Sequence, residues 1–204
     1  MTAWMTTPTL RGAQVLLRPM EQTDADAVVA AAADGALNEL FYTAVPGPDE
    51  IDVYMARVAR TMAAGEEQVF AVIRLTDGRL VGSTRYMRMS PENRRLEIGN
   101  TFYAASCQRT GLNTETKLLL LTHAFDLMGC IKVELRTDRF NRTSQRAIER
   151  LGAQRDGILR QDAIMPDGRV RDTVCYSILD REWPSVRANL AGFLKRGDGH
   201  ARSA

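Results

Sequence analysis

The chain has 204 residues, of which 45% are hydrophobic and 25% are charged. These values are ordinary for a globular protein in water, and the length suits one domain, 1–204, with a sizeable core. The net charge of +2 and the 6% of aromatic residues argue against a nucleic-acid-binding protein. No apolar run reaches the length of a membrane span, and no signal-peptide pattern opens the chain. We therefore expect a cytoplasmic protein that binds neither nucleic acid nor membranes.

The cysteines and histidines give no sign of a metal site or a disulfide framework. Cys107, Cys130 and Cys175 are scattered without a C-x-x-C motif, which favours reduced thiols. His123 and His200 are too far apart to suggest a metal pair. His123 lies among apolar helix residues, so we expect it to be structural, and Cys107 is expected to pack rather than react.

In the first half of the chain, periodicity and capping residues predict two helices among several strands. Thr23 or Asp24 is expected to cap the first helix, and Asp49 the second, after the break at 46–48. The Asp77-Gly78 pair predicts a hairpin turn. The expected order is a loose lead-in (1–10), a strand (14–18), a helix to Ala33, a helix from Asp49 to Gly65, and strands at 68–75 and 79–89.

The central stretch, 97–121, reads as a strand, a polar loop and a long apolar helix. Gly99 inside the strand predicts a bulge or a close approach of another group to the backbone. The loop 108–113 precedes a helix expected to begin near Thr114. Unpaired N–H groups and the positive end of the helix dipole would meet there, and Arg109 adds a permanent charge. The pattern predicts a phosphate-binding site.

After this helix, which Gly129 is expected to end, strands and helices alternate. Periodicity alone favours an α/β or α+β domain with a mixed sheet. The expected elements are a strand (132–137), a helix from Asn141 to Gly152, strands (154–164 and 170–179) joined by a turn at 166–168, a C-terminal helix (182–195) and a disordered tail (197–204).

The chain resembles the GNAT superfamily of acetyl-CoA-dependent acetyltransferases at Glu97-Ile98-Gly99 and in the segment 108–121. Within that superfamily it is most similar to the RimJ/RimL-like branch of ribosomal-protein N-terminal acetyltransferases. The resemblance covers about 10–184 and implies the GNAT fold, a mostly antiparallel central sheet flanked by helices. In that family the loop reads Gln/Arg-x-x-Gly-x-Gly/Ala, and its amides hold the CoA pyrophosphate; Asn113 departs from the last position. The implied cofactor-binding residues are Gly99, Asn100, Thr101, Phe102, Gln108, Arg109, Thr110, Gly111, Leu112, Asn113 and Asn141.

A second match to this family begins at Asn141 and continues through Ser144 to Gly152. The resemblance implies that Asn141 contacts the pantetheine or a bound water and that Ser144 lies near the CoA sulfur as a candidate proton donor. Asn at a helix cap and Ser in the first turn also explain these residues structurally. Both interpretations can hold together.

Amide formation from a thioester requires a proton acceptor for the amine and a donor for the developing oxyanion. The resemblance implies that the donor is a backbone N–H within 99–102. Glu97 is the candidate base, and the alternative is a strand carboxylate paired with Arg94, Arg95 or Arg136. Lys117 and the row Arg142, Arg146 and Arg150 are expected to be solvated, with a phosphate contact as the lesser alternative for Lys117 and Arg142.

The sequence thus predicts an N-acetyltransferase that uses acetyl-CoA as co-substrate, without a metal. The acceptor would be a primary amine, either a protein N-terminus or a small molecule, and the segment 41–62 would form one wall of its site. Tyr42, Tyr54 and Met55 are candidate lining residues, although their spacing is also that of a core face. Asn100 stands where the branch often has an aromatic residue, which puts a ribosomal substrate in question. A CoA-binding sensor without catalysis remains the alternative, and the oligomeric state, monomer or homodimer, stays open.

Overall fold

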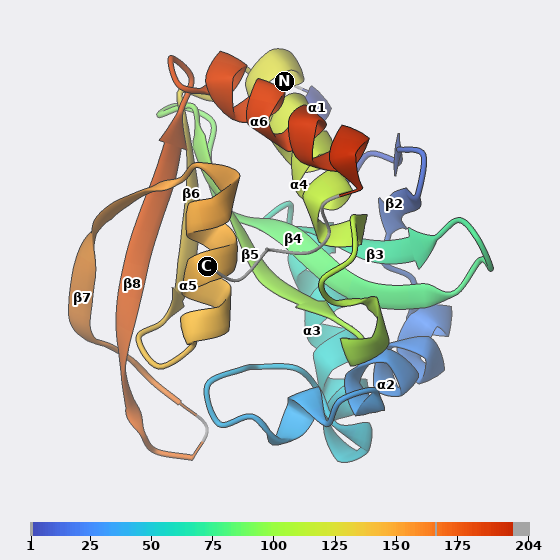
Figure 1. The fold of residues 1–204 in the computed structure, drawn as a ribbon. Helices are drawn as coiled ribbons and strands as arrows, with labels where there is room; N and C mark the ends of the chain where they lie inside the picture. The colour runs from blue at the N-terminus through green and yellow to red at the C-terminus, as the bar shows by residue number, and fades with distance from the viewer. Residues whose placement is uncertain (1, 166, 198–204) are drawn as a thin grey trace.

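The computed structural model describes residues 2–165 and 167–197, so the predicted tail at 197–204 lies outside the described residues except for Gly197, and so does His200. An eight-stranded sheet runs through the molecule in the order β1-β2-β3-β4-β5-β6-β8-β7 (Figure 1). Its neighbours pair antiparallel except β5 and β6, which are parallel. The predicted mixed, mostly antiparallel sheet flanked by helices is therefore confirmed.

The first half of the chain forms β1 to β5 and three helices. The lead-in is not loose, because Thr2–Met5 is a short helix and Trp4 packs against the core. The bounds are α1 (Thr2–Met5), β1 (Leu10–Arg11), β2 (Val15–Pro19), α2 (Ala25–Ala33), α3 (Ile51–Ala63), β3 (Gln68–Arg74), β4 (Leu80–Ser90) and β5 (Arg95–Tyr103).

The second half supplies the other helices and strands at or near their predicted positions. The bounds are α4 (Leu112–Thr122), β6 (Lys132–Asp138), α5 (Arg142–Leu151), β7 (Gln154–Ile164), β8 (Val170–Leu179) and α6 (Trp183–Arg196). A π-helical turn at His123–Leu127 continues α4, and Gly129 follows it with a positive φ of 68°.

Three predicted helix starts need correction. Asp24 precedes α2 as predicted, but its carboxylate accepts from the Glu21 N–H and from Arg18 instead of capping the helix. Asp49 lies within a 3₁₀ turn before α3 and is not its cap. The helix α4 begins at Leu112, two residues before the predicted Thr114.

The helices cover opposite faces of the sheet. Tyr86 of β4 donates its hydroxyl proton to the Leu120 carbonyl of α4 (2.6 Å), whereas the adjacent Arg85 donates to Tyr54 of α3 (3.0 Å). Because neighbouring side chains on a strand point to opposite faces, α3 and α4 lie on opposite sides of β4. Figure 1 shows α5 and α6 on the same side as α4.

The N-terminal strands are joined to α4 by a buried carboxylate. Glu115, in the first turn of α4, accepts backbone N–H groups of Ala13, Gln14 and Val15 at 2.7–2.9 Å. A Cβ on Gly12 would lie 2.5 Å from the same carboxyl carbon, so glycine is required there. This contact fixes the start of α4 against the sheet.

Candidate active site

The strands β5 and β6 separate after a short pairing. Their register covers Arg95–Glu97 against Lys132–Glu134, and both strands then continue, to Tyr103 and to Asp138. Figure 1 shows the two strands diverging beyond this paired end. Past the junction, each strand has an edge whose N–H and C=O groups face the gap between them. The gap therefore offers an extended ligand a backbone surface for hydrogen bonding.

A β-bulge shapes the β5 side of this gap. Arg85 of β4 pairs with Gly99 and Ser83 with Phe102, so a single β4 residue lies opposite Asn100 and Thr101. Asn100 has a positive φ of 46°, and both extra residues are exposed. The bulge predicted from Gly99 is thus confirmed, one residue further along. Phe102 is buried, so its backbone and not its ring is the part available to a ligand.

Glu97 lies at the junction of the two strands and is 5% exposed. Its Oε2 is 3.2 Å from Arg88 Nε and 3.3 Å from Arg136 Nε, but neither contact has hydrogen-bond alignment. The predicted partner Arg136 is confirmed, whereas Arg88 takes the place proposed for Arg94 or Arg95. Burial raises the pKa of Glu97, and Arg136 and Arg88 oppose that rise.

The side chain of Glu97 lies against Gly99. A Cβ on Gly99 would lie 2.9 Å from Glu97 Oε1 and 2.7 Å from Met87 Sδ, so a side chain at position 99 would displace the carboxylate. Gly99 therefore allows a buried carboxylate to lie directly beside the bulge at Asn100.

The loop before α4 has the form of an anion site. Arg109 is exposed and adopts the left-handed conformation, with φ of 58°. Thr110 Oγ1 accepts the Leu112 N–H at 3.4 Å, while the other N–H groups of the first turn have no partner within the helix. Gln108 points back and donates to the Tyr103 carbonyl (3.0 Å). Asn113, which departs from the family pattern, is already helical, and Arg109 makes the sharp turn.

Asn141 and Ser144 open α5. The Ser144 N–H donates to Asn141 Oδ1 at 2.9 Å, so the capping interpretation is confirmed. The Asn141 side-chain N–H₂ and the Ser144 hydroxyl have no hydrogen-bond partner within the described part of the chain. Their contact with CoA remains a prediction.

Lys117 was predicted to be solvated, and this is wrong. The side chain is 5% exposed, and its Nζ donates to Thr101 Oγ1 on the bulge (2.9 Å). Thr101 Oγ1 lies 2.7 Å from Thr84 Oγ1, so α4 is linked through the bulge to β4. Burial lowers the pKa of Lys117 to about 7. No sequence signal separates this lysine from a surface lysine, because its burial depends on the packing of α4 over β5.

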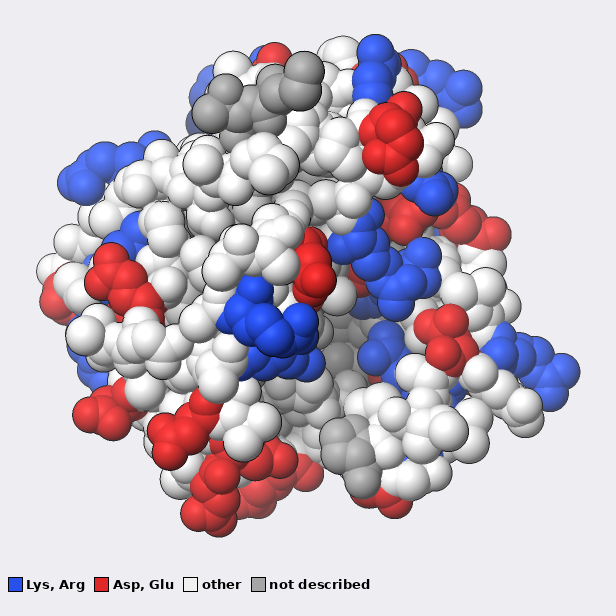
Figure 2. Space-filling model, turned by 180° about the vertical axis from the view of Figure 1, so that it is seen from behind, with Lys and Arg blue, Asp and Glu red and all other residues white. Residues whose placement is uncertain are grey.

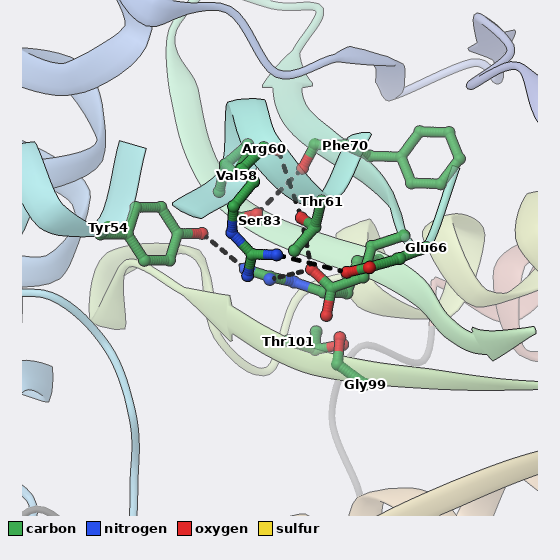
Figure 3. Close-up of polar contacts among 11 residues, drawn as sticks. Tyr54, Val58, Arg60, Thr61, Glu66, Phe70, Ser83, Gly99 and Thr101 are labelled. Atoms are coloured by element: carbon green, nitrogen blue, oxygen red, sulfur yellow. Dashed lines mark hydrogen bonds and ion pairs between the residues drawn. The ribbon is translucent and has the colours of Figure 1, made fainter. Parts of the chain in front are cut away.

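The face opposite α4 holds a second buried charge. Arg85, 1% exposed, donates to Glu67 (2.7 Å) and to the Tyr54 hydroxyl (3.0 Å). Figure 3 shows Tyr54 and Thr61 pointing into this polar cluster, with Gly99 and Thr101 on the strand beneath it. Tyr54 therefore orients a buried guanidinium close to the bulge.

Other predicted residues serve the core. Met55 is 2% exposed and belongs to the core, so it does not line a site, and Tyr42 packs edge-on against Phe41. His123 is buried and stacks on Tyr86, as expected of a structural histidine. Arg150 is not solvated, because it donates to Thr114 of α4 (2.7 Å) and lies over the Phe193 ring.

The polar residues at the splayed strands have no metal-binding pattern: among the described residues, no group of three His, Cys, Asp or Glu side chains could hold a metal ion. None of the described helices is long and apolar enough to cross a membrane. A parallel strand pair that splays beside a bulge, with a helix N-terminus at its edge, matches the class of fold that the resemblance to the GNAT superfamily implies.

Comparison with known proteins agrees with this class. The family model for the "Acetyltransferase (GNAT) domain" matches residues 14–154. The chain belongs to the GNAT acetyltransferase family. A GCN5-related N-acetyltransferase from Brucella melitensis is 30% identical, with a TM-score of 0.81 over 92% of this chain and 86% of that one.

Two further similar proteins bear on the branch of the family. The "Putative ribosomal N-acetyltransferase YdaF" of Bacillus subtilis is 32% identical over 109 residues, 53% of this chain. The match spans only 58% of YdaF. RimJ of Mycobacterium smegmatis, solved with CoA-disulfide, is 21% identical with a TM-score of 0.76, covering 96% of this chain and 97% of that one. At that identity RimJ shows the shared fold alone. The predicted GNAT resemblance is confirmed, and YdaF supports its RimJ/RimL-like branch.

Proposed function

We propose that this protein transfers an acetyl group from acetyl-CoA directly to a primary amine. The observation that carries the proposal is the position of Glu97, a buried carboxylate with a raised pKa beside the bulge of β5. A general base is most effective when its pKa lies near the working pH. Acetyl-CoA supplies the activated acetyl group; in the reaction the amine nitrogen forms the new amide bond as the carbon–sulfur bond breaks.

The residues of the chain fit the co-substrate. The exposed bulge at Asn100 and Thr101 presents backbone to the gap, and the N–H groups at the start of α4 suit a pyrophosphate. Arg109 adds a charge at that end. A backbone N–H of the bulge would stabilise negative charge on the acetyl oxygen. Asn141 would contact the pantetheine arm.

Proton transfer would be divided between two side chains. Glu97 would accept the proton that the amine loses on attack, and the Ser144 hydroxyl would donate a proton to the leaving thiolate. The cap bond uses the backbone N–H of Ser144 and leaves its hydroxyl free for this role. The thiolate is a tolerable leaving group, so we expect Ser144→Ala to lower kcat modestly and without rescue at high pH.

The acceptor is the open part of this proposal. YdaF is named as a putative ribosomal N-acetyltransferase, which favours a protein N-terminus, whereas the polar Asn100 at the bulge favours a more polar acceptor. A panel of N-terminal peptides and small amines, assayed by thiol release, separates these cases. Amine-dependent thiol release with a matching acetylated product is the expected result. Slow thiol release that no amine accelerates would overturn the proposal in favour of a CoA-binding sensor.

A further inference from the structure

The wall of the gap formed by β6 and β8 carries an unusual number of charged groups on one face. The register places Arg136 opposite Cys175 and Asp138 opposite Thr173. Because paired residues share a face and strands alternate, Arg136, Thr173 and Arg171 lie on one face of the sheet. Glu97 shares it, since it pairs with Glu134 of β6. We call this face the polar wall. It begins at the candidate base Glu97 and continues through Glu134, Arg136, Asp138, Thr173 and Arg171.

The carboxylates of the wall are already neutralised by other arginines and a lysine. Arg136 contacts Glu97 and Glu134, Lys132 also pairs with Glu134, and Arg169 donates to the buried Asp138 at 2.7 Å. Arg171 has no hydrogen-bond or ion-pair partner among the described residues. It is near enough to Glu97 to lower the pKa of that carboxyl. Arg171 is thus the surplus cation of the wall.

Unpaired polar atoms gather around this cation. Thr173, two residues along the same face, is 1% exposed, and its Oγ1 has no hydrogen-bond partner. The Nε atoms of Arg136, Arg169 and Arg171 are also buried without a hydrogen bond. Such atoms are rare in folded proteins because each loses its contacts with water. The three Nε–H groups are donors, so a group rich in acceptor oxygens would suit them, whereas the acceptor Glu97 Oε2 already lies beside Arg88 and Arg136.

The wall lies on the face of the sheet opposite α5, because Tyr176, which alternates with Cys175 along β8, donates to Glu149 of α5. Figure 2, which views the side opposite α5, shows a hollow near the middle of the molecule with Lys and Arg side chains on both sides. An excess of positive charge around a hollow attracts anions. This is the face of the sheet that carries the wall.

We infer that the acceptor is an amine that also carries a carboxylate, and that Arg171 and Thr173 bind this carboxylate while the amine approaches Glu97. This inference rests on the proposed acetyl transfer and names the class of its acceptor. Arginine suits a carboxylate because its planar donors match both oxygens. The carboxylate can come from a free amino acid or from an acidic residue next to a peptide N-terminus, because the shared chemistry is the same.

The test compares acceptors that differ only in this charge. The small-molecule arm uses β-alanine against its amide, and the peptide arm uses C-terminally amidated Ser-Asp-Ala-Ala against Ser-Asn-Ala-Ala. The carboxylate member of at least one pair should have the higher kcat/KM by about 10- to 100-fold, since a site built for a polar group rejects the analogue lacking it. The arm that shows the preference tells whether the carboxylate belongs to a free amino acid or to a residue of a peptide.

Arg171→Gln should remove this preference, measured as the ratio of kcat/KM for the two members so that a change in the pKa of Glu97 affects both alike, and Thr173→Val should reduce the preference less. The matched control is Arg79→Gln, an exposed arginine in the turn between β3 and β4, which should keep the full preference. Equal kcat/KM for both members of both pairs, or an Arg171→Gln variant that slows both members equally, would overturn the inference while leaving acetyl transfer intact. Absence of transfer to any amine would instead defeat the proposed function, and this inference with it.

Discussion

Glu97 is both a paired carboxylate and a carboxylate suited to proton transfer. An ion pair in water would lower its pKa, yet burial dominates, and the pKa is raised despite two nearby guanidinium groups. The alignment of Arg88 and Arg136 explains this balance, because neither Nε donates a proper hydrogen bond to the carboxylate. The two interpretations of Glu97 drawn from the sequence are therefore compatible at the level of one side chain.

Replacing Glu97 tests its role as the base. Glu97→Gln should lower kcat/KM at neutral pH by about 10²–10⁴-fold, the usual contribution of a general base, and higher pH should partly restore it because more amine is then neutral. Binding of acetyl-CoA should be unchanged. Rates across pH with a good acceptor, measured beside the melting temperature, check this. Wild-type kcat/KM at every pH would make Glu97 purely structural.

The neighbouring arginines predict the direction of a pH shift. Arg136 opposes the raised pKa of Glu97, so Arg136→Met should raise that pKa further and move the acid limb of kcat/KM to higher pH. Arg88→Met should move it less, since Arg88 is 56% exposed and better screened by water. The pH profiles of the two variants give the comparison, and an acid limb that stays in place in both would argue that another group titrates.

Lys117 predicts a pH dependence of stability. Its pKa is about 7 in the folded protein and 10.5 unperturbed, so the unfolded chain binds an extra proton between these values. The contribution of Lys117 to the free energy of unfolding should therefore increase as the pH rises from 7 to about 10.5. Lys117→Met should be more stable than wild type at neutral pH, with the difference shrinking as pH rises.

Urea unfolding of the wild type and Lys117→Met at several pH values between 6 and 10 measures this contribution. Lys195→Met, which removes an exposed lysine of α6, serves as the control and should follow the wild type. Wild-type and Lys117→Met curves that run parallel would show that Lys117 is charged in the folded protein.

At the scale of elements, local signals in the sequence predict most of the boundaries. Alternating hydrophobic residues and the Asp77-Gly78 turn locate β3 and β4, and Asn141 and Gly152 locate both ends of α5. Two of the misplaced starts share one cause. The side chains expected to begin a helix are used elsewhere, Asp24 by Arg18 and Thr114 by Arg150, and such side-chain partners are not visible in the local pattern of capping residues. The bulge was predictable because Gly99 interrupts a strand, whereas its consequence for Glu97 depends on a tertiary contact.

The start of α4 gives a prediction about the co-substrate. Gly111 has an ordinary φ of −67°, so it tolerates a side chain in its backbone conformation, but a Cβ there lies 2.9 Å from the flexible Gln14 amide. Gly111→Ala should therefore fold and bind acetyl-CoA with a small loss. Gly111→Asp should lose the rise in melting temperature that acetyl-CoA produces, because a carboxylate would face the pyrophosphate. An unchanged rise in folded Gly111→Asp would place the co-substrate elsewhere.

At the scale of the molecule, the two parts of the sheet are joined by few backbone bonds at the splay. Three residue pairs connect β5 and β6, and the helices supply the remaining support. Trp183 of α6 stacks on Phe125 and donates to Asp126 at the end of α4, while Arg150 joins α5 to the first turn of α4. The order of elements could be predicted from the sequence. The charges of the polar wall could not, because they meet only when β6, β8 and β5 lie side by side.

This architecture predicts where acetyl-CoA should slow amide hydrogen exchange. Beyond the junction, β5 lacks a neighbour on its β6 side, so amides within 98–103 should open locally with little cost in the free protein. A ligand that fills the gap would cover them and the first turn of α4. Exchange measured by mass spectrometry with and without acetyl-CoA should therefore slow in 98–103 and 109–115. The edge strand β7 serves as the internal control, since it lies two strands away from the gap. Equal protection of β7 and β5 would indicate general tightening of the fold and would argue against binding in the gap.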